Sequence, residues 1–186
     1  MADVHKALLV AGSPSHASRS TWVLESFGEH LRSRGVEVAR VSLEDFDAEA
    51  LLRGRTEHPS VNAFLAKVRD STAVVLSTPV YKATYAGSLK TIVDLIDPAG
   101  LEGKRLLGIA TARLESHLRT VSVSFLQLSR FFRGCIALPS IALLDPQVGQ
   151  PGAFKLDAVA EAALDDAVRA IVSRQAAFDA TDVRRA

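Results

Sequence analysis

Residues 7–20 read ALLVAGSPSHASRS, a continuous apolar run that stops at Gly12 and passes into a loop rich in serine. A short apolar run without alternation is typical of a strand that is buried on both faces of a parallel sheet. From about Ser20 to Arg34, apolar residues recur at helical spacing, and Gly35 follows as a helix cap. The chain is therefore expected to begin with a strand, a polar loop and a helix.

The alternation of strand and helix continues along the chain. Further strands are expected at 36–41, 72–76, 106–110 and 136–143, the last interrupted by Pro139, and further helices near 60–70, 89–96 and 157–178. This order predicts an α/β fold, a doubly wound, five-stranded parallel sheet with helices on both faces. The run 145–154 is expected to be a surface loop without regular structure, because it holds two prolines and two glycines. We expect a single domain over residues 1–180 and a disordered tail over 181–186.

The composition argues against several classes of partner. With 22 basic and 21 acidic side chains, the chain has a formal charge of +1, so neither nucleic acid nor an anionic membrane is expected to bind it. No apolar run approaches the roughly 20 residues that span a bilayer, and no export signal is visible. The single cysteine, Cys135, indicates a reducing, cytoplasmic location. No metal is expected, because the five histidines are scattered and no cysteine or carboxylate pair has ligand spacing.

The loop after the first expected strand predicts a phosphate site. It places four serines and an arginine where the N–H groups of a helix start already favour an anion. Hydroxyls of Ser13, Ser18 and Ser20 would donate to phosphate oxygens, and Arg19 would offer paired donors. A plain turn with a helix cap is the alternative, although a cap requires only one serine. The glycine and lysine patterns of nucleoside triphosphate and dinucleotide loops are both absent.

A second segment, STPVYKATYAGSLK at residues 77–90, follows the third expected strand. Together with AGSP at 11–14 and SRS at 18–20, it resembles the NADPH-dependent FMN reductase family. The resemblance is closest to the branch that supplies reduced flavin to alkanesulfonate monooxygenases, and it covers nearly the whole chain. It implies a flavodoxin-like fold in which the first loop binds the FMN phosphate. The residues that it implies for FMN are Ser13, Ser18, Arg19 and Ser20 for the phosphate, and Pro79, Val80 and Tyr81 for the flavin ring.

The loop after the fourth expected strand departs from the family pattern. It reads Ala-Thr-Ala-Arg at residues 110–113, where the family commonly has Ala-Thr-Gly-Gly. Thr111 and Arg113 are predicted to belong to the cofactor site. Arg113 either pairs with the electron-rich edge of reduced flavin, or fills the space of a ring, or points to solvent, and the sequence leaves these three interpretations open.

The resemblance implies an oxidoreductase that passes a hydride from NAD(P)H to FMN and supplies reduced FMN to a partner monooxygenase. Because the cofactors, FMN and NADPH, carry the chemistry, no catalytic side chain is expected. Two alternatives stay open. One is an FMN-retaining quinone or azo-type reductase, and the other is a flavodoxin-fold paralogue that lost flavin turnover through Ala112 and Arg113 and acts as a subunit or binding protein. The sequence does not choose between NADH and NADPH.

The helix expected at 114–133 carries apolar residues on two faces. One seam repeats at steps of four and three and is expected to pack on the sheet: Leu114, Leu118, Val121, Phe125, Leu128 and Phe132. Val123, Leu126 and Phe131 lie off that seam, which indicates contact with another subunit. The resemblance also implies a homodimer or homotetramer through this helix, and a helix buried within one chain is the alternative.

Overall fold

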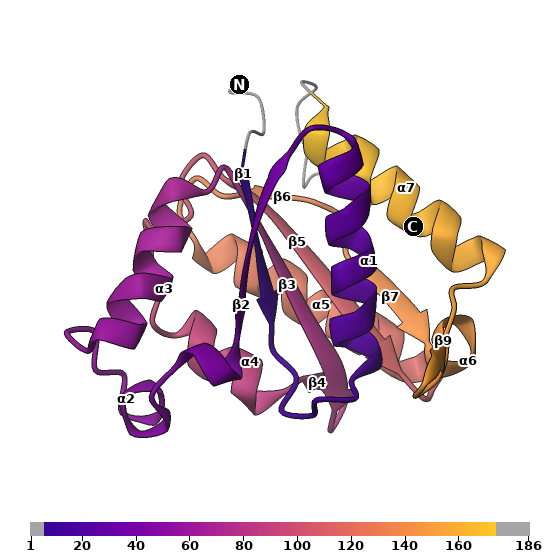
Figure 1. Cartoon of the computed structure of the whole chain (residues 1–186), viewed down its shortest axis with the longest axis horizontal. Coiled ribbons are helices and arrows are strands. Elements are labelled where there is room, and N and C mark those ends of the chain that lie inside the picture. The colour runs from indigo at the N-terminus through magenta and orange to yellow at the C-terminus, as the bar shows by residue number, and fades with distance from the viewer. Residues whose placement is uncertain (1–5, 174–186) are drawn as a thin grey trace.

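The computed structural model describes residues 6–173, so the tail expected at 181–186 and residues 174–178 of the expected closing helix lie outside the described residues. Its main sheet runs in the order β2-β1-β3-β5-β6, all in parallel register, with β7 also parallel to β5 (Figure 1). The strands are β1 (Lys6–Ala11), β2 (Glu37–Ser42), β3 (Ala73–Tyr81), β5 (Arg105–Ala112), β6 (Ile136–Ala137) and β7 (Ile141–Leu144). The short β4 (Thr84–Tyr85) pairs antiparallel with the end of β3. The doubly wound parallel sheet is thereby confirmed.

The sheet has seven strands rather than the expected five. Part of the difference is the β3–β4 hairpin, and part is that the last expected strand is split into β6 and β7. Both halves pair with β5, where residues 107–108 face the three residues 138–140. The extra residue forms a bulge at Pro139, which has no N–H to donate to a ladder. The break that the proline predicted is confirmed.

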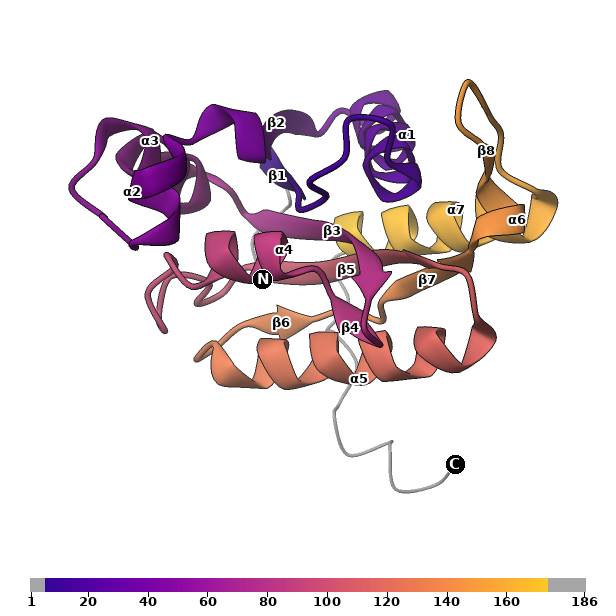
Figure 2. The same cartoon turned by 90° about the horizontal axis from the view of Figure 1, so that it is seen from below.

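Helices cover both faces of the sheet, as the alternation predicted. On one face lie α1 (Arg19–Ser33) and α7 (Ala158–Val172), and on the other lie α2 (Ala48–Leu52), α3 (Pro59–Asp70), α4 (Gly87–Val93) and α5 (Glu115–Phe131). Figure 2 shows α1 and α7 on the opposite side of the sheet from α5. Within β1, Leu9 packs in the core under α1 and Leu8 in the core under α3, because successive strand side chains point to opposite faces.

The segment 145–154 corrects one expectation. Instead of an irregular loop, it forms the short helix α6 (Asp145–Val148) and a hairpin of β8 (Gly149–Gln150) and β9 (Ala153–Phe154). Gly149 and Gly152 have φ of 82° and 87°. The glycines that indicated an irregular loop therefore permit the tight backbone of this hairpin. A short 3-10 helix, η1 (Leu43–Asp45), follows β2.

Candidate functional site

The loop between β1 and α1 is fastened at both ends. The Gly12 N–H donates to the carbonyl oxygen of Ser77 at 2.8 Å, and the Ser88 hydroxyl donates to the Gly12 carbonyl at 2.6 Å. At the other end, the Ser77 hydroxyl donates to the Ser20 carbonyl at 2.6 Å. A Cβ on Gly12 would lie 2.5 Å from the Cβ of Leu89, so a glycine is required where α4 crosses the loop.

Two of the three predicted serines meet at the start of α1. Ser18 caps the helix by accepting from the Thr21 N–H at 3.4 Å, and its hydroxyl lies 2.9 Å from that of Ser20. Both side chains are buried. Whichever hydroxyl donates to the other, one O–H proton of the pair is left for a ligand. Ser13 lies earlier in the loop, where it accepts from the Ser15 N–H at 3.2 Å.

Backbone groups add to this donor set. Arg19 and Ser20 are the first two residues of α1, and the first N–H groups of a helix have no acceptor within it. Together with the free hydroxyl proton, they make the start of α1 a donor site for an anion. The plain-cap alternative therefore accounts for Ser18 but does not account for the buried hydroxyl of Ser20.

Arg19, predicted to bind the phosphate, contacts protein acceptors in this structure. Its Nε donates to the Gly149 carbonyl at 2.8 Å, one Nη donates to Gln150 Oε1 at 2.8 Å, and the other Nη lies 3.5 Å from Asp145 Oδ2. The side chain thus crosses to α6 and β8, where three of its five N–H groups face protein acceptors. We attribute this to the structured 145–154 segment, which the sequence did not reveal. The other donors at the start of α1 are serine hydroxyls and backbone N–H groups.

The Pro79-Val80-Tyr81 segment forms the end of β3 rather than a loop. Val80 pairs with Tyr85, and the two-residue turn between the strands consists of Lys82 and Ala83, with φ of 52° and 67°. Thr84 donates from its hydroxyl to that of Ser124 on α5 at 3.0 Å. Pro79 and Val80 are half-buried, whereas Tyr81 is exposed, so its ring has a free face.

The loop after β5 lies beside this hairpin. Thr111 pairs with Pro79 in the sheet and is buried. Arg113 is exposed, and it has no hydrogen bond or ion pair with any residue of the described range 6–173. Its side chain is consequently free to meet a ligand. The loop ends at Leu114, which precedes α5 without a side-chain cap and is exposed.

The carboxyl ends of β1, β3 and β5 therefore meet at one edge of the sheet, which is where ligands bind to open α/β sheets. Two cavities of about 450 Å³ each flank the start of α1. One is lined by Ser13, Thr21, Arg40, Ser42 and others near the end of β2, and the second by Arg19, Arg113, Asp145, Pro146 and Gln150.

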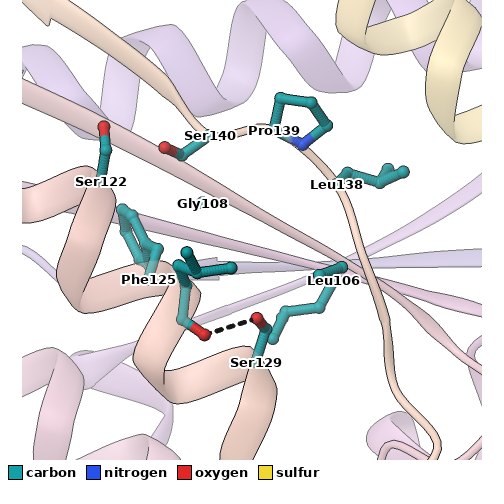
Figure 3. A pocket seen from close by; sticks show the side chains of 10 residues that line it. Leu106, Gly108, Ser122, Phe125, Ser129, Leu138, Pro139 and Ser140 are labelled. Atoms are coloured by element: carbon teal, nitrogen blue, oxygen red, sulfur yellow. Dashed lines mark hydrogen bonds between the residues drawn. The ribbon is translucent and has the colours of Figure 1, made fainter. Parts of the chain in front are cut away.

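A third cavity, of about 380 Å³, lies between α5 and the β6–β7 bulge (Figure 3). Gly108 and Phe125 lie on its floor, and Pro139 and Ser140 lie across from them. None of its ten lining residues is ionisable. It offers no charge to a phosphate.

No helix in the described range 6–173 is both long and apolar enough to cross a bilayer. No three or more histidine, cysteine or carboxylate side chains in that range are grouped so that they would hold a metal ion.

Comparisons with known proteins show the family of the chain. The family model for NADPH-dependent FMN reductases matches residues 5–150. An FMN reductase (NADPH) of Pseudomonas putida is 37% identical over 139 residues, which cover 75% of this chain and 71% of the relative. An FMN reductase (NADPH) of Escherichia coli is 38% identical over 116 residues, and the match spans 62% of this chain but only 61% of the relative's length. A more distant relative, the NADH-dependent FMN reductase SfnF of Pseudomonas putida, is 26% identical over 137 residues.

Solved structures share the fold. An NADH:FMN oxidoreductase in its apo form superposes with a TM-score of 0.82 at 20% identity, covering 98% of this chain and all of that one. An archaeal flavodoxin superposes with a TM-score of 0.61 at 13% identity, over 90% of this chain and 96% of that chain. At these identities the likeness concerns the fold alone, and it makes the sheet flavodoxin-like.

Proposed function

The chain belongs to the NADPH-dependent FMN reductase family, and from this premise we propose that it passes a hydride from NADPH to FMN at the carboxyl edge of its sheet. The observation that carries the proposal is the buried Ser18–Ser20 hydroxyl pair, 2.9 Å apart in the first turn of α1. A monoester phosphate needs several donors converging on one point, and the free hydroxyl proton and the first N–H groups of the helix provide them.

The neighbouring loops suit a flavin ring. The ring of Tyr81 is exposed, and Pro79 and Val80 form the end of β3, where Pro79 pairs with Thr111. A planar ring placed over this edge packs against the tyrosine face while its polar rim meets the loop after β5. FMN would supply the hydride-accepting ring, and the chain's own residues orient it and exclude water around it. We assign no acid, base or nucleophile.

We also propose that reduced FMN leaves this edge for a partner monooxygenase. The support is the sequence resemblance to the branch that serves alkanesulfonate monooxygenases. Cavities on both flanks of α1 leave the edge open, which is compatible with an exchangeable flavin rather than an enclosed one. The FMN-retaining quinone or azo-type reductase would instead keep its flavin and pass the electrons to such an acceptor at the same ring. A cytoplasmic location remains a prediction from the single cysteine.

The subunit arrangement is a separate proposal. Val123 and Phe131 on α5 are exposed, as expected of a face that meets another copy of the chain, whereas Leu126 is half-buried at the cavity of Figure 3. Val121, Phe125 and Phe132 of the predicted core seam are buried, but Leu114 is exposed, because it lies before the first turn of α5 and not on it. We propose a homodimer or homotetramer through this face.

The oligomer proposal is tested by light scattering on Phe131→Asp, which should yield a smaller particle than the unaltered chain. Val159→Asp, a change at an exposed apolar residue of α7, is the matched control and should leave the mass unchanged. Equal masses for all three proteins would contradict the α5 interface.

The reductase proposal is tested by FMN titration followed by NADPH oxidation. Protein that is colourless on purification, binds FMN and oxidises NADPH only when FMN is added is the expected result. A yellow protein that keeps its flavin through gel filtration would favour the quinone or azo-type reductase. Protein that neither binds FMN nor oxidises NADPH would contradict flavin chemistry altogether.

A further inference from the structure

The second cavity beside α1 combines three charged side chains, Arg19 from the serine loop and Arg113 and Asp145 from elsewhere in the chain. It is lined by Arg19, Arg113, Asp145, Pro146 and Gln150, and it lies between the first turn of α1, the end of β5 and α6. Its walls come from three separate segments of the chain, so its charge pattern depends on the tertiary fold.

The charges in this cavity do not cancel. Asp145 lies 3.5 Å from the Arg19 guanidinium, and both side chains are only about one quarter exposed, at 23% and 22%. Arg19 is further fixed by the Gly149 carbonyl and by Gln150. Arg113 has no such partner among residues 6–173. The cavity is left with one unpaired guanidinium, next to the positive end of the α1 dipole, which favours an anion there.

We infer that Arg113 binds the 2′-phosphate of NADPH in this cavity and thereby selects NADPH over NADH. The inference rests on the proposed function, in which the Ser18–Ser20 pair already takes the phosphate of FMN. The two nicotinamide cofactors differ only in the 2′-phosphate monoester, and a guanidinium fork binds such a group with two parallel hydrogen bonds. An arginine serves nicotinamide cofactors in this way in other α/β folds.

FMN and NADPH both carry a phosphate monoester, so the experiment must show which of the two phosphates Arg113 binds. Arg113→Ala is compared with Arg130→Ala, which removes the same charge from the exposed last turn of α5. For each protein, KM is measured with NADPH and with NADH, and Kd is measured with FMN and with riboflavin. Arg113→Ala should raise KM for NADPH by about 10- to 100-fold, the loss expected for charge-assisted hydrogen bonds, and leave KM for NADH within twofold.

The Kd values for FMN and riboflavin should keep their ratio in Arg113→Ala, and Arg130→Ala should change none of the four values. Loss of the preference for FMN over riboflavin would instead assign Arg113 to the flavin phosphate and overturn the inference. Equal losses for NADPH and NADH, or no loss with either, would also overturn it. Arg113→Lys keeps the charge without the guanidinium fork, so its KM for NADPH should lie between those of the unaltered chain and Arg113→Ala.

A binding measurement separates failure of this inference from failure of the proposed function. Calorimetric titration with 2′-AMP and with 5′-AMP needs neither FMN nor turnover. The unaltered chain should bind 2′-AMP at least tenfold more tightly than 5′-AMP, and Arg113→Ala should abolish the difference. If NADPH oxidation fails but this preference is found, the reductase proposal fails and the cavity assignment stands; equal binding of the two nucleotides would refute the assignment even in an active reductase.

Discussion

The loops after β1 and after β5 reach the same edge of the sheet but are built differently. The first is held by hydrogen bonds from Gly12, Ser77 and Ser88, and its Ser18–Ser20 pair is buried. The second carries the exposed Arg113, which has no hydrogen bond or ion pair in the described part of the chain. Protein contacts therefore fix the geometry of the first loop before any ligand arrives, whereas the second loop offers one charged side chain that a ligand must position.

The largest effect should come from disturbing the fastened loop. In Gly12→Ala the new Cβ would lie 2.5 Å from Leu89 Cβ and 2.8 Å from the Ser77 carbonyl oxygen, and neither is a flexible side-chain end. We expect a loss of about 3 kcal/mol in the free energy of unfolding, measured by urea denaturation, since overpacking costs about 1–3 kcal/mol or more.

Gly87→Ala is the matched control for this change. A Cβ there meets nothing within 4 Å, and Gly87 begins the helix α4, where alanine is well tolerated. The control should change the unfolding free energy by less than about 1 kcal/mol. If the two variants were equally stable, the close packing of α4 on the first loop would be refuted.

A smaller effect, on ligand affinity, is expected within the same loop. Ser20→Ala removes the hydroxyl that holds Ser18 in place, so the O–H proton that Ser18 keeps is no longer oriented for the phosphate. FMN should bind about tenfold more weakly, a change of about 1.4 kcal/mol, by fluorescence titration, because a charge-assisted hydrogen bond contributes about that much. Ser15→Ala, at an exposed serine of the same loop, should bind FMN normally; equal losses in both variants would point to a general disturbance of the loop.

The two loops also differ in how far sequence could predict them. The apolar runs of β1, β3 and β5 and the break at Pro139 could be predicted, because burial on both faces of a sheet and a missing N–H are properties of short segments. Ser18 and Ser20 could be placed at the start of a helix, because the preference of serine for that position is also local. The path of Arg19 could not, since its acceptor, the Gly149 carbonyl, lies 130 residues away in a segment whose glycines indicated an irregular loop.

The hairpin between the loops was missed for a related reason. A two-residue turn with positive φ at both positions normally carries asparagine, aspartate or glycine, and Lys82-Ala83 gives no such signal. The pairing of Val80 with Tyr85 and the Thr84–Ser124 hydrogen bond hold the turn in spite of its backbone strain. Strained residues beside a candidate ring site are thus a product of tertiary contacts that no local pattern encodes.

Ala83→Gly tests whether the backbone strain of this hairpin lowers the stability of the folded chain. Glycine adopts φ near 67° without steric cost, so the variant should be more stable by about 1 kcal/mol in urea denaturation. Ala83→Val should be destabilised, because a β-branched side chain is least suited to positive φ. A stability gain in the glycine variant accompanied by weaker FMN binding would show that the strain positions Tyr81, and an unchanged stability would refute the strain.

Cys135 lies between α5 and β6 and remote from both loops, so changes in the loops are expected to affect it least. Burial raises the pKa of its thiol to about 11, so the folded chain holds far less thiolate at pH 8 than an unfolded one with its ordinary pKa of 9.0. A two-unit difference in pKa predicts about 100-fold slower alkylation by iodoacetamide in the folded protein than in urea.

The sign of the pH dependence follows from the same pKa. Alkylation of the folded protein should rise about tenfold per pH unit from pH 8 towards 11, where the thiol ionises, while the unfolded protein levels off near pH 9. Ser20→Ala and Arg113→Ala should react at the native rate, since neither touches the core around Cys135. Gly12→Ala is the informative case: a native rate would confine its strain to the first loop, and faster alkylation under native conditions would mean that the fastened loop supports the far side of the sheet as well.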